Sequence, residues 1–169
     1  FEQAGIEVHY SGIGKVNAAF KAFDVIQKTG CHTLLNLGTA GSSHFKAHEL
    51  VEVIQFVQRD MDVSPLGFEV GVTPMDQDYP AAIDLEPYFQ DLLQGICGTG
   101  DSFETSTPKV ACNLVDMEGY ALAKVCKKLN VRLISVKYIT DGADGTAHLD
   151  WQENLLLGAQ KLFKLYQSI

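Results

Sequence analysis

TLLNLGTAGS, residues 33–42, carries the strongest signal of fold class in this chain. Its first half is a short, apolar run that predicts a buried strand, and its second half is a loop of small residues. The same order occurs upstream, where residues 6–10 predict a short strand and Ser11-Gly12-Ile13-Gly14-Lys15 predicts a tight turn into a helix. Two units of strand followed by glycine loop indicate an α/β sheet.

The rest of the chain continues this alternation of helix and strand. Apolar β-rich runs predict strands at residues 50–57, 96–101 and 131–139. Asp150 with Glu153 resembles a capping box at the start of the last helix. The helix after Lys15 is predicted to bury Val16, Ala19, Phe20, Phe23 and Ile26. Small polar loops follow the strands, and ligands of such folds bind at the strand ends.

Length and charge limit the classes of function. The chain has 169 residues, which suits one sizeable core and is too short for two ordinary domains. Its net charge of -8 repels nucleic-acid phosphates and anionic lipid surfaces. No apolar run approaches the roughly 20 residues that span a bilayer. We therefore expect a single domain over residues 1–169, with neither nucleic acid nor membrane as a partner.

The cysteines and histidines do not indicate a metal or redox site. Cys31, Cys97, Cys112 and Cys126 lack the close pairing of a zinc knuckle or a redox motif. This spacing favours reduced, mostly buried thiols in a cytoplasmic protein. His44 and His48 would share a helix face, but a metal site needs a third convergent ligand that the sequence does not supply. No metal and no organic cofactor is expected.

Two acidic sites in the last third of the chain carry the candidate chemistry. Asp116-Met117-Glu118 is predicted to open a helix, and Thr140-Asp141-Gly142 is predicted to end a strand. Cleavage of an N-glycosidic bond leaves a poor anionic base and a cation-like ribose. One acid must therefore protonate the base, and a second carboxylate must hold the sugar hydroxyls. Alone, Glu118 is equally an acid that complements a helix dipole, and Asp141 an ordinary loop acid.

The ordered set of motifs resembles the purine nucleoside phosphorylase and uridine phosphorylase superfamily. Within it, the chain is most similar to the hydrolytic branch, the methylthioadenosine/S-adenosylhomocysteine nucleosidases. The matching motifs are SGIGK at 11–15, GTAG at 38–41, TGDSF at 99–103, DME at 116–118 and TD at 140–141. The resemblance runs from about residue 5 to the C-terminus. It implies a three-layer α/β domain with a central mixed, twisted sheet flanked by helices.

The resemblance also implies a role for each matched residue. Asp141 would protonate N7 of a purine, with its pKa raised by burial, and Glu118 would bind the ribose 2'- and 3'-hydroxyls. Phe103 would stack on the base, Met117 would pack beneath the sugar, and Trp151 would wall the 5'-substituent. The expected substrate-binding residues are Thr39, Ala40, Gly41, Phe103, Glu104, Asp116, Met117 and Trp151.

Water is the expected nucleophile, near Thr39. Phosphorylases of the superfamily carry an arginine two residues before the glycine loop, where this chain has Asn36. The family's first strand, whose loop supplies a water-activating glutamate, would precede Phe1, so we expect a domain that begins without it. A second departure is Lys137, where the family has an arginine four residues before the catalytic aspartate.

The sequence thus predicts a purine nucleosidase acting on a nucleoside such as methylthioadenosine or S-adenosylhomocysteine. A phosphate-dependent phosphorylase and a non-catalytic nucleoside-binding protein remain the alternatives. The resemblance implies a homodimer, and the proline-rich, least regular segment, residues 60–87, is a candidate lid or partner surface.

Overall fold

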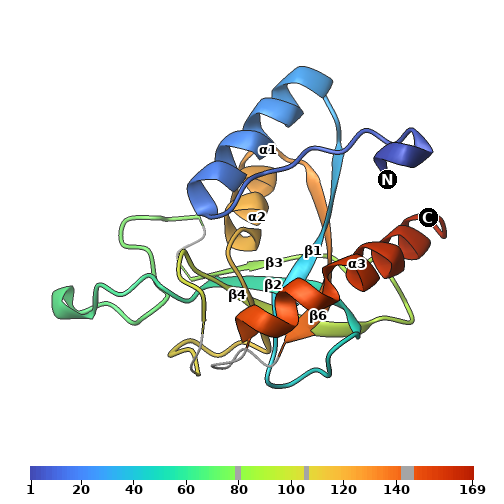
Figure 1. The fold of residues 1–169 in the computed structure, drawn as a ribbon. Helices are drawn as coiled ribbons and strands as arrows, with labels where there is room; N and C mark the ends of the chain where they lie inside the picture. The colour runs from blue at the N-terminus through green and yellow to red at the C-terminus, as the bar shows by residue number, and fades with distance from the viewer. Residues whose placement is uncertain (79–80, 105–106, 142–146) are drawn as a thin grey trace.

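A six-stranded mixed β-sheet forms the centre of the computed structural model, which describes residues 1–78, 81–104, 107–141 and 147–169 (Figure 1). Side chains are described at these positions except 3, 141 and 147–153. The strands are β1 (Thr33–Gly41), β2 (Leu50–Gln58), β3 (Ala82–Asp84), β4 (Leu93–Thr99), β5 (Leu114–Asp116) and β6 (Arg132–Asp141). The helices are α1 (Lys15–Thr29), α2 (Gly119–Lys128) and α3 (Ala147–Tyr166), with 3-10 turns η1 (Glu2–Ala4) and η2 (Ser64–Leu66). The predicted mixed sheet with flanking helices is confirmed.

The sheet curls until two distant strands meet. Its order is β3-β2-β4-β5-β1-β6, and β2 pairs a second time, antiparallel, with β6. β1 and β6 run parallel over their whole length, from the pair Thr33 and Arg132 to the pair Gly41 and Asp141. Because this closure joins β2 to β6 as well as to β4, the strand ends and the loops that follow them converge on one side of the sheet.

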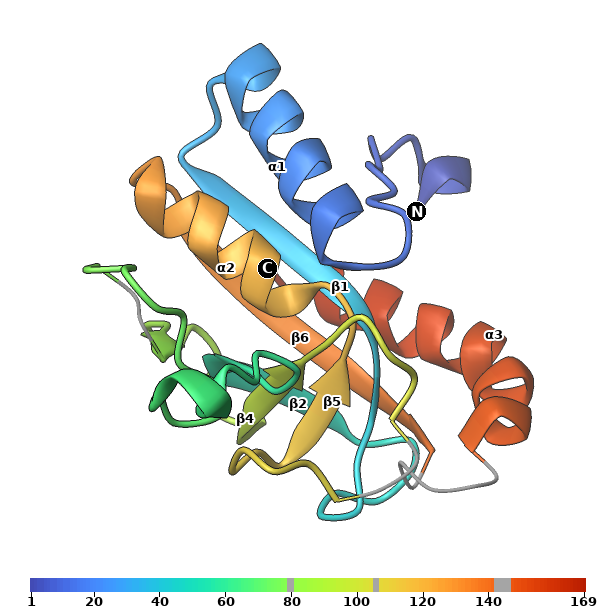
Figure 2. The same cartoon turned by 90° about the vertical axis from the view of Figure 1, so that its left-hand side faces the viewer.

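The helices form layers on the two faces of the sheet. α2 packs on β2, β4 and β6, and α1 packs on α2, while α3 lies on the opposite face against β6 and β1 (Figure 1, Figure 2). α3 approaches closely at Gly158, where a Cβ would lie 2.7 Å from Cδ1 of the Tyr138 ring. The main buried cluster lies between the sheet and α2, and it includes Val51, Val53, Phe56, Cys97, Leu114 and Leu122.

The predicted buried face of α1 is wrong at its large residues Val16, Phe20 and Phe23, and it is confirmed at Ile26. Val16 and Phe20 are 79% and 72% exposed, whereas Ala18, Ala22 and Ile26 are buried. The reason is that α1 rests on α2 rather than directly on the sheet. Two helices in close contact favour small side chains between them, so alanines fill the contact and the larger apolar residues face outward.

Three other local predictions are also wrong. Residues 6–10 are not a strand, because a strand needs a paired neighbour and no described strand pairs with them. α3 begins at Ala147, so Asp150 lies inside the helix instead of capping it. Asp116 ends β5 and does not open a helix, since α2 begins at Gly119 with Glu118 as its N-cap.

All four cysteines are free thiols, with Cys97 and Cys126 buried and Cys31 and Cys112 partly exposed. No helix within the described ranges has the length and apolarity that crossing a membrane requires.

Candidate active site

One cavity of about 260 Å³ lies where the ends of β1, β5 and β6 meet the loops that follow β2 and β4. Eight residues predicted to bind substrate line it: Thr39, Ala40, Gly41, Phe103, Glu104, Asp116, Met117 and Glu118. Ile13, Arg59, Ser102, Val115 and Thr140 complete the described lining. The structure therefore brings together motifs that are distant in the sequence, because all of them except the turn at Ile13 follow or end strands.

Asp141 and Trp151 are the two remaining predicted residues, and their side chains lie outside the described residues. The main chain of Asp141 ends β6 and pairs with Gly41 of β1. Its neighbour Thr140 lines the cavity. The register of β1 and β6 thus brings the main chain of Asp141 next to the cavity, while Trp151 is in the second turn of α3.

Glu118 is the N-cap residue of α2 and faces the cavity with a largely buried carboxylate. Its Oε1 accepts a hydrogen bond of 2.9 Å from the Gly14 main-chain N–H. Burial raises the pKa of Glu118, although this hydrogen bond and the Lys137 ammonium oppose the rise. The glycine turn before α1 therefore holds the Glu118 carboxylate at the cavity.

Asp116 precedes Glu118 by two residues, and both of its carboxylate oxygens have partners. Its Oδ1 accepts from Thr99 Oγ1 at 2.6 Å, and its Oδ2 accepts from Gly119 N at 2.9 Å. Lys137 Nζ lies 2.7 Å from the same Oδ2. Burial alone would raise the pKa of Asp116, but the Lys137 ammonium and these hydrogen bonds lower it overall. Asp116 is therefore an anion that fixes the β5–α2 turn.

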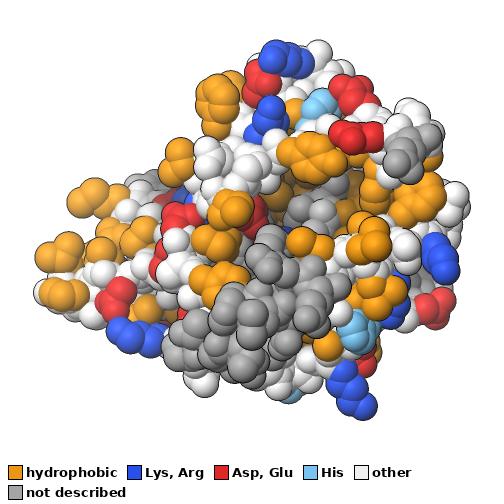
Figure 3. All heavy atoms as spheres, in the orientation of Figure 1, with side chains coloured by type: hydrophobic (Ala, Val, Ile, Leu, Met, Phe, Trp, Pro, Cys, Tyr) orange, Lys and Arg blue, Asp and Glu red, His pale blue; other side chains and the backbone are white. Residues whose placement is uncertain are grey.

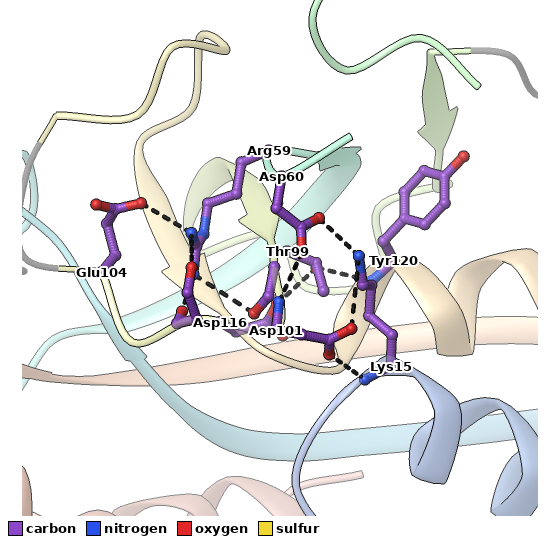
Figure 4. A network of polar contacts seen from close by, with 10 residues as sticks. Lys15, Arg59, Asp60, Thr99, Asp101, Glu104, Asp116 and Tyr120 are labelled. Carbon is purple, nitrogen blue, oxygen red and sulfur yellow. Dashed lines mark hydrogen bonds and ion pairs between the residues drawn. The ribbon is translucent and has the colours of Figure 1, made fainter. Parts of the chain in front are cut away.

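A second polar network ties the N-terminus of α1 to the loop after β4 (Figure 4). Asp60 Oδ1 accepts from Lys15 Nζ at 2.6 Å, and Asp60 Oδ2 accepts from Asp101 N at 2.8 Å. The Lys15 main-chain N–H in turn donates to Asp101 Oδ1 at 2.7 Å. Burial would raise the pKa of Asp60, but Lys15 and the Asp101 N–H lower it overall. This network anchors the start of the loop that carries Phe103.

Arg59 is the cavity residue that sequence reasoning missed. It directly follows β2, and its Nη1 donates to Glu104 Oε2 at 2.8 Å (Figure 4). The available signal was a lone basic residue at the end of an apolar strand, next to Asp60. Nothing local in the sequence connects it with Glu104, which is 45 positions away.

The cavity can hold a nucleoside-sized ligand by chemistry that its walls display. Phe103 and Met117 contribute apolar side chains to the walls. Glu118 supplies a carboxylate acceptor. Within the described part of the chain, no group of three or more His, Cys, Asp or Glu side chains converges as metal ligands would.

Known proteins share both the sequence pattern and the fold. The family model described as the phosphorylase superfamily matches residues 5–169. A 5'-methylthioadenosine/S-adenosylhomocysteine nucleosidase from Haemophilus influenzae is 33% identical, with 89% of this chain and 74% of that protein covered. An aminodeoxyfutalosine nucleosidase from Helicobacter pylori is 31% identical, with 97% and 79% covered.

Solved structures give the same result. The Helicobacter pylori 5'-methylthioadenosine/S-adenosylhomocysteine nucleosidase with butyl-thio-DADMe-Immucillin-A matches with a TM-score of 0.86 at 27% identity. The match covers 94% of this chain and 76% of that one. The chain belongs to the phosphorylase superfamily, in the group that contains these nucleosidases.

Proposed function

We propose that this protein hydrolyses the N-glycosidic bond of a purine nucleoside and releases the free base and the ribose sugar, without a metal or an organic cofactor. The observation that carries the proposal is the placement of Glu118. Its carboxylate is held by Gly14 N–H in a cavity whose walls also carry Phe103 and Met117. An aromatic ring, a thioether and a carboxylate suit a base, a sugar face and two hydroxyl groups respectively.

Asp141 and Glu118 divide the chemistry. Asp141 donates a proton or a hydrogen bond to N7 of the purine, so that the base departs as a neutral molecule. Glu118 accepts hydrogen bonds from the 2'- and 3'-hydroxyls and stabilises the positive charge that grows on the ribose. Phe103 stacks on the base, and main-chain groups at Phe103 and Glu104 contact the edge of the base. Trp151 packs beside the 5'-substituent.

Water, placed near Thr39, is the nucleophile. The choice of water over phosphate is supported by the cationic side chains, because binding of phosphate needs at least one that is not already paired. Arg59 is the one cation among the described lining residues, and it donates to Glu104 and to the loop after β4. Lys137 pairs with Asp116. Asn36 is a residue of β1, and its Nδ2 donates to Oγ of Ser135 in β6 at 3.0 Å.

The substrate class is a purine nucleoside with a thioether at the 5' position, such as methylthioadenosine or S-adenosylhomocysteine. The proposal follows the names of the relatives, several of which are 5'-methylthioadenosine/S-adenosylhomocysteine nucleosidases. A relative named for aminodeoxyfutalosine makes that nucleoside the competing substrate to test.

The protein acts as a cytoplasmic homodimer in this proposal. Hydrophobic side chains gather on the surface around α1 (Figure 3). Ile13, Val16 and Phe20 are each at least 70% exposed, and Phe23 is 49% exposed. An apolar stripe of this kind on one helix is typical of a covered surface. A second copy of the chain is the occupant that we propose.

Chromatographic detection of free base tests the proposed function. The protein is incubated with methylthioadenosine, S-adenosylhomocysteine, adenosine, inosine and aminodeoxyfutalosine, each with and without phosphate. Base release that does not depend on phosphate is expected, and the fastest substrate names the 5'-substituent. Release only with phosphate would identify a phosphorylase, and tight binding without release would identify a non-catalytic nucleoside-binding protein.

A further inference from the structure

The Arg59 guanidinium is buried against the loop that carries Phe103. Its side chain is 4% exposed. Nη1 donates to Ser102 Oγ at 3.2 Å and to Glu104 Oε2 at 2.8 Å. Nη2 donates to the main-chain oxygens of Gly100, at 3.4 Å, and Ser102. One side chain at the end of β2 therefore contacts three residues of the segment 100–104.

Gly100 provides the space in which the guanidinium lies. A Cβ at this position would lie 2.8 Å from Arg59 Cζ and 2.9 Å from its Nη1. Any other residue would displace the guanidinium, because carbon atoms do not approach so closely. The main chains are joined as well, since Arg59 N donates to Thr99 O at 2.9 Å. The start of the loop and the arginine are thus fitted to each other.

The contacts of Arg59 fall on both sides of Phe103. Ser102 is held through its hydroxyl and its carbonyl, and Glu104 is held through its carboxylate. Phe103 itself lines the cavity and is 49% exposed. Half of this ring faces solvent, so packing alone does not fix its position. The guanidinium therefore holds the residues on both sides of this ring.

Stability alone does not explain this arrangement. The Nε–H of Arg59 is buried and has no hydrogen-bond partner among the described residues. An unpaired buried donor costs free energy, and buried ion pairs are seldom better for stability than apolar packing. A costly group that lines a ligand cavity is instead typical of a functional position.

We propose that Arg59 is a positioning residue that holds Ser102 to Glu104 in the geometry that binds the purine base, with Glu104 neutralising its charge. The inference rests on the proposed function, because it assigns the base to the Phe103 side of the cavity. It differs from the role of Glu118, which concerns the sugar. Lysine can take the place of Arg59 only in part, because a planar fork of donors contacts several acceptors at once and an ammonium group does not.

The test compares Arg59→Met, Arg59→Lys and Glu104→Gln with the wild-type protein. The probes are free adenine and methylthioadenosine. We expect Arg59→Met to raise the dissociation constant for adenine and the KM for the nucleoside by the same factor, about tenfold or more. Arg59→Lys and Glu104→Gln should fall between Arg59→Met and wild type. Lys109→Met is the matched control, because it removes a cation from an exposed pair with Asp62, with Nζ and Oδ2 3.0 Å apart.

Amide hydrogen exchange of residues 100–104 gives a second readout. Exchange should accelerate in Arg59→Met while strand β4 keeps its wild-type protection, which separates release of the loop from general unfolding. An adenine affinity within twofold of wild type in folded Arg59→Met overturns the proposal. Unchanged exchange of the loop overturns it as well. If the wild-type protein neither binds adenine nor releases it from methylthioadenosine, the proposed function is contradicted instead. The role of Arg59 is not what fails in that case, because no residue has been substituted.

Discussion

Lys137 Nζ lies 2.7 Å from Asp116 Oδ2, and the two side chains are only 3% and 1% exposed. The pair links β6 to the end of β5, two residues before Glu118. Gly38 of β1 leaves space for the lysine, because a Cβ there would lie 3.3 Å from Lys137 Nζ. The ion pair therefore fixes the turn from which the proposed sugar-binding carboxylate of Glu118 projects.

Lys137→Met should lower the free energy of unfolding by about 3–5 kcal/mol, because it leaves a buried carboxylate without its cation. Urea denaturation measures the change. The double variant Lys137→Met with Asp116→Asn should lose less than the sum of the single variants, since it removes both charges. Lys28→Met, which removes an exposed i,i+4 pair with Asp24, serves as the control and should change stability by less than about 0.5 kcal/mol. Additive losses in the double variant would contradict a direct coupling.

Asp141→Asn should lower kcat by about 10²- to 10⁴-fold and leave the affinity for nucleoside nearly unchanged, because proton donation matters mainly in the transition state. Single-turnover base release measures the chemical step, and inhibition by an unreactive nucleoside analogue measures affinity. Asp84→Asn is the matched control, since Asp84 is an exposed acid at the end of β3, where it accepts from Gln55. A rate close to that of the wild type would remove Asp141 from the mechanism.

The sequence predicted four of the six strands, β1, β2, β4 and β6, and the meeting of the loops that follow them, for reasons visible in particular residues. The run Leu34-Leu35-Asn36-Leu37 is mostly apolar and is followed by Gly38, and such a run predicts a strand; in β1 its side chains are partly rather than fully buried. Once the strands are known, loops at their ends converge by geometry, which is why Thr39 and Glu118 line one cavity. Their assignment to substrate came from the family resemblance and not from geometry.

Other features depend on contacts between distant parts of the chain. The second pairing of β2, with β6, has no local signature, because a strand sequence does not encode how many neighbours it has. The link between Arg59 and Glu104 is equally invisible. The buried face of α1 was mispredicted because Phe20 is more apolar than Ala18 or Ala22, and hydrophobicity alone does not reveal that the neighbouring element is another helix.

Glu118→Gln should weaken the binding of nucleosides about tenfold or more and leave the binding of free adenine unchanged, because only the sugar contacts this carboxylate. In the wild type, nucleoside affinity should fall as the pH drops through the pKa of Glu118, which burial raises above its ordinary value of 4.5. Titration calorimetry with an unreactive nucleoside analogue and with adenine between pH 4 and 8 measures both. Glu118→Gln should abolish the pH dependence. Equal weakening of base and nucleoside would instead mean a structural role.

Acidification should remove nucleoside binding before it removes the fold. The pKa of Asp116 is lowered from 3.8, so its ionised form stabilises the folded state above the unfolded pKa. That contribution is lost only as the pH falls through the lowered pKa. The pKa of Glu118 is instead raised. This carboxylate is therefore protonated, and nucleoside binding is lost, at a higher pH than the one at which Asp116 is protonated. Circular dichroism should therefore report a folded protein at a pH where nucleoside no longer binds, and simultaneous loss of both would contradict the assignment.

Phe20→Glu should convert a homodimer into a monomer, because it places a charge in the proposed interface. Phe20 of α1 and Leu156 of α3 are both apolar and both 72% exposed, so Leu156→Glu is a control matched in chemistry and exposure. Sedimentation equilibrium should give twice the chain mass of 18.5 kDa for the wild type and for Leu156→Glu, and the mass of one chain for Phe20→Glu. A wild-type protein that sediments as a monomer would reject the homodimer. Dissociation by Leu156→Glu instead would move the interface from α1 to α3.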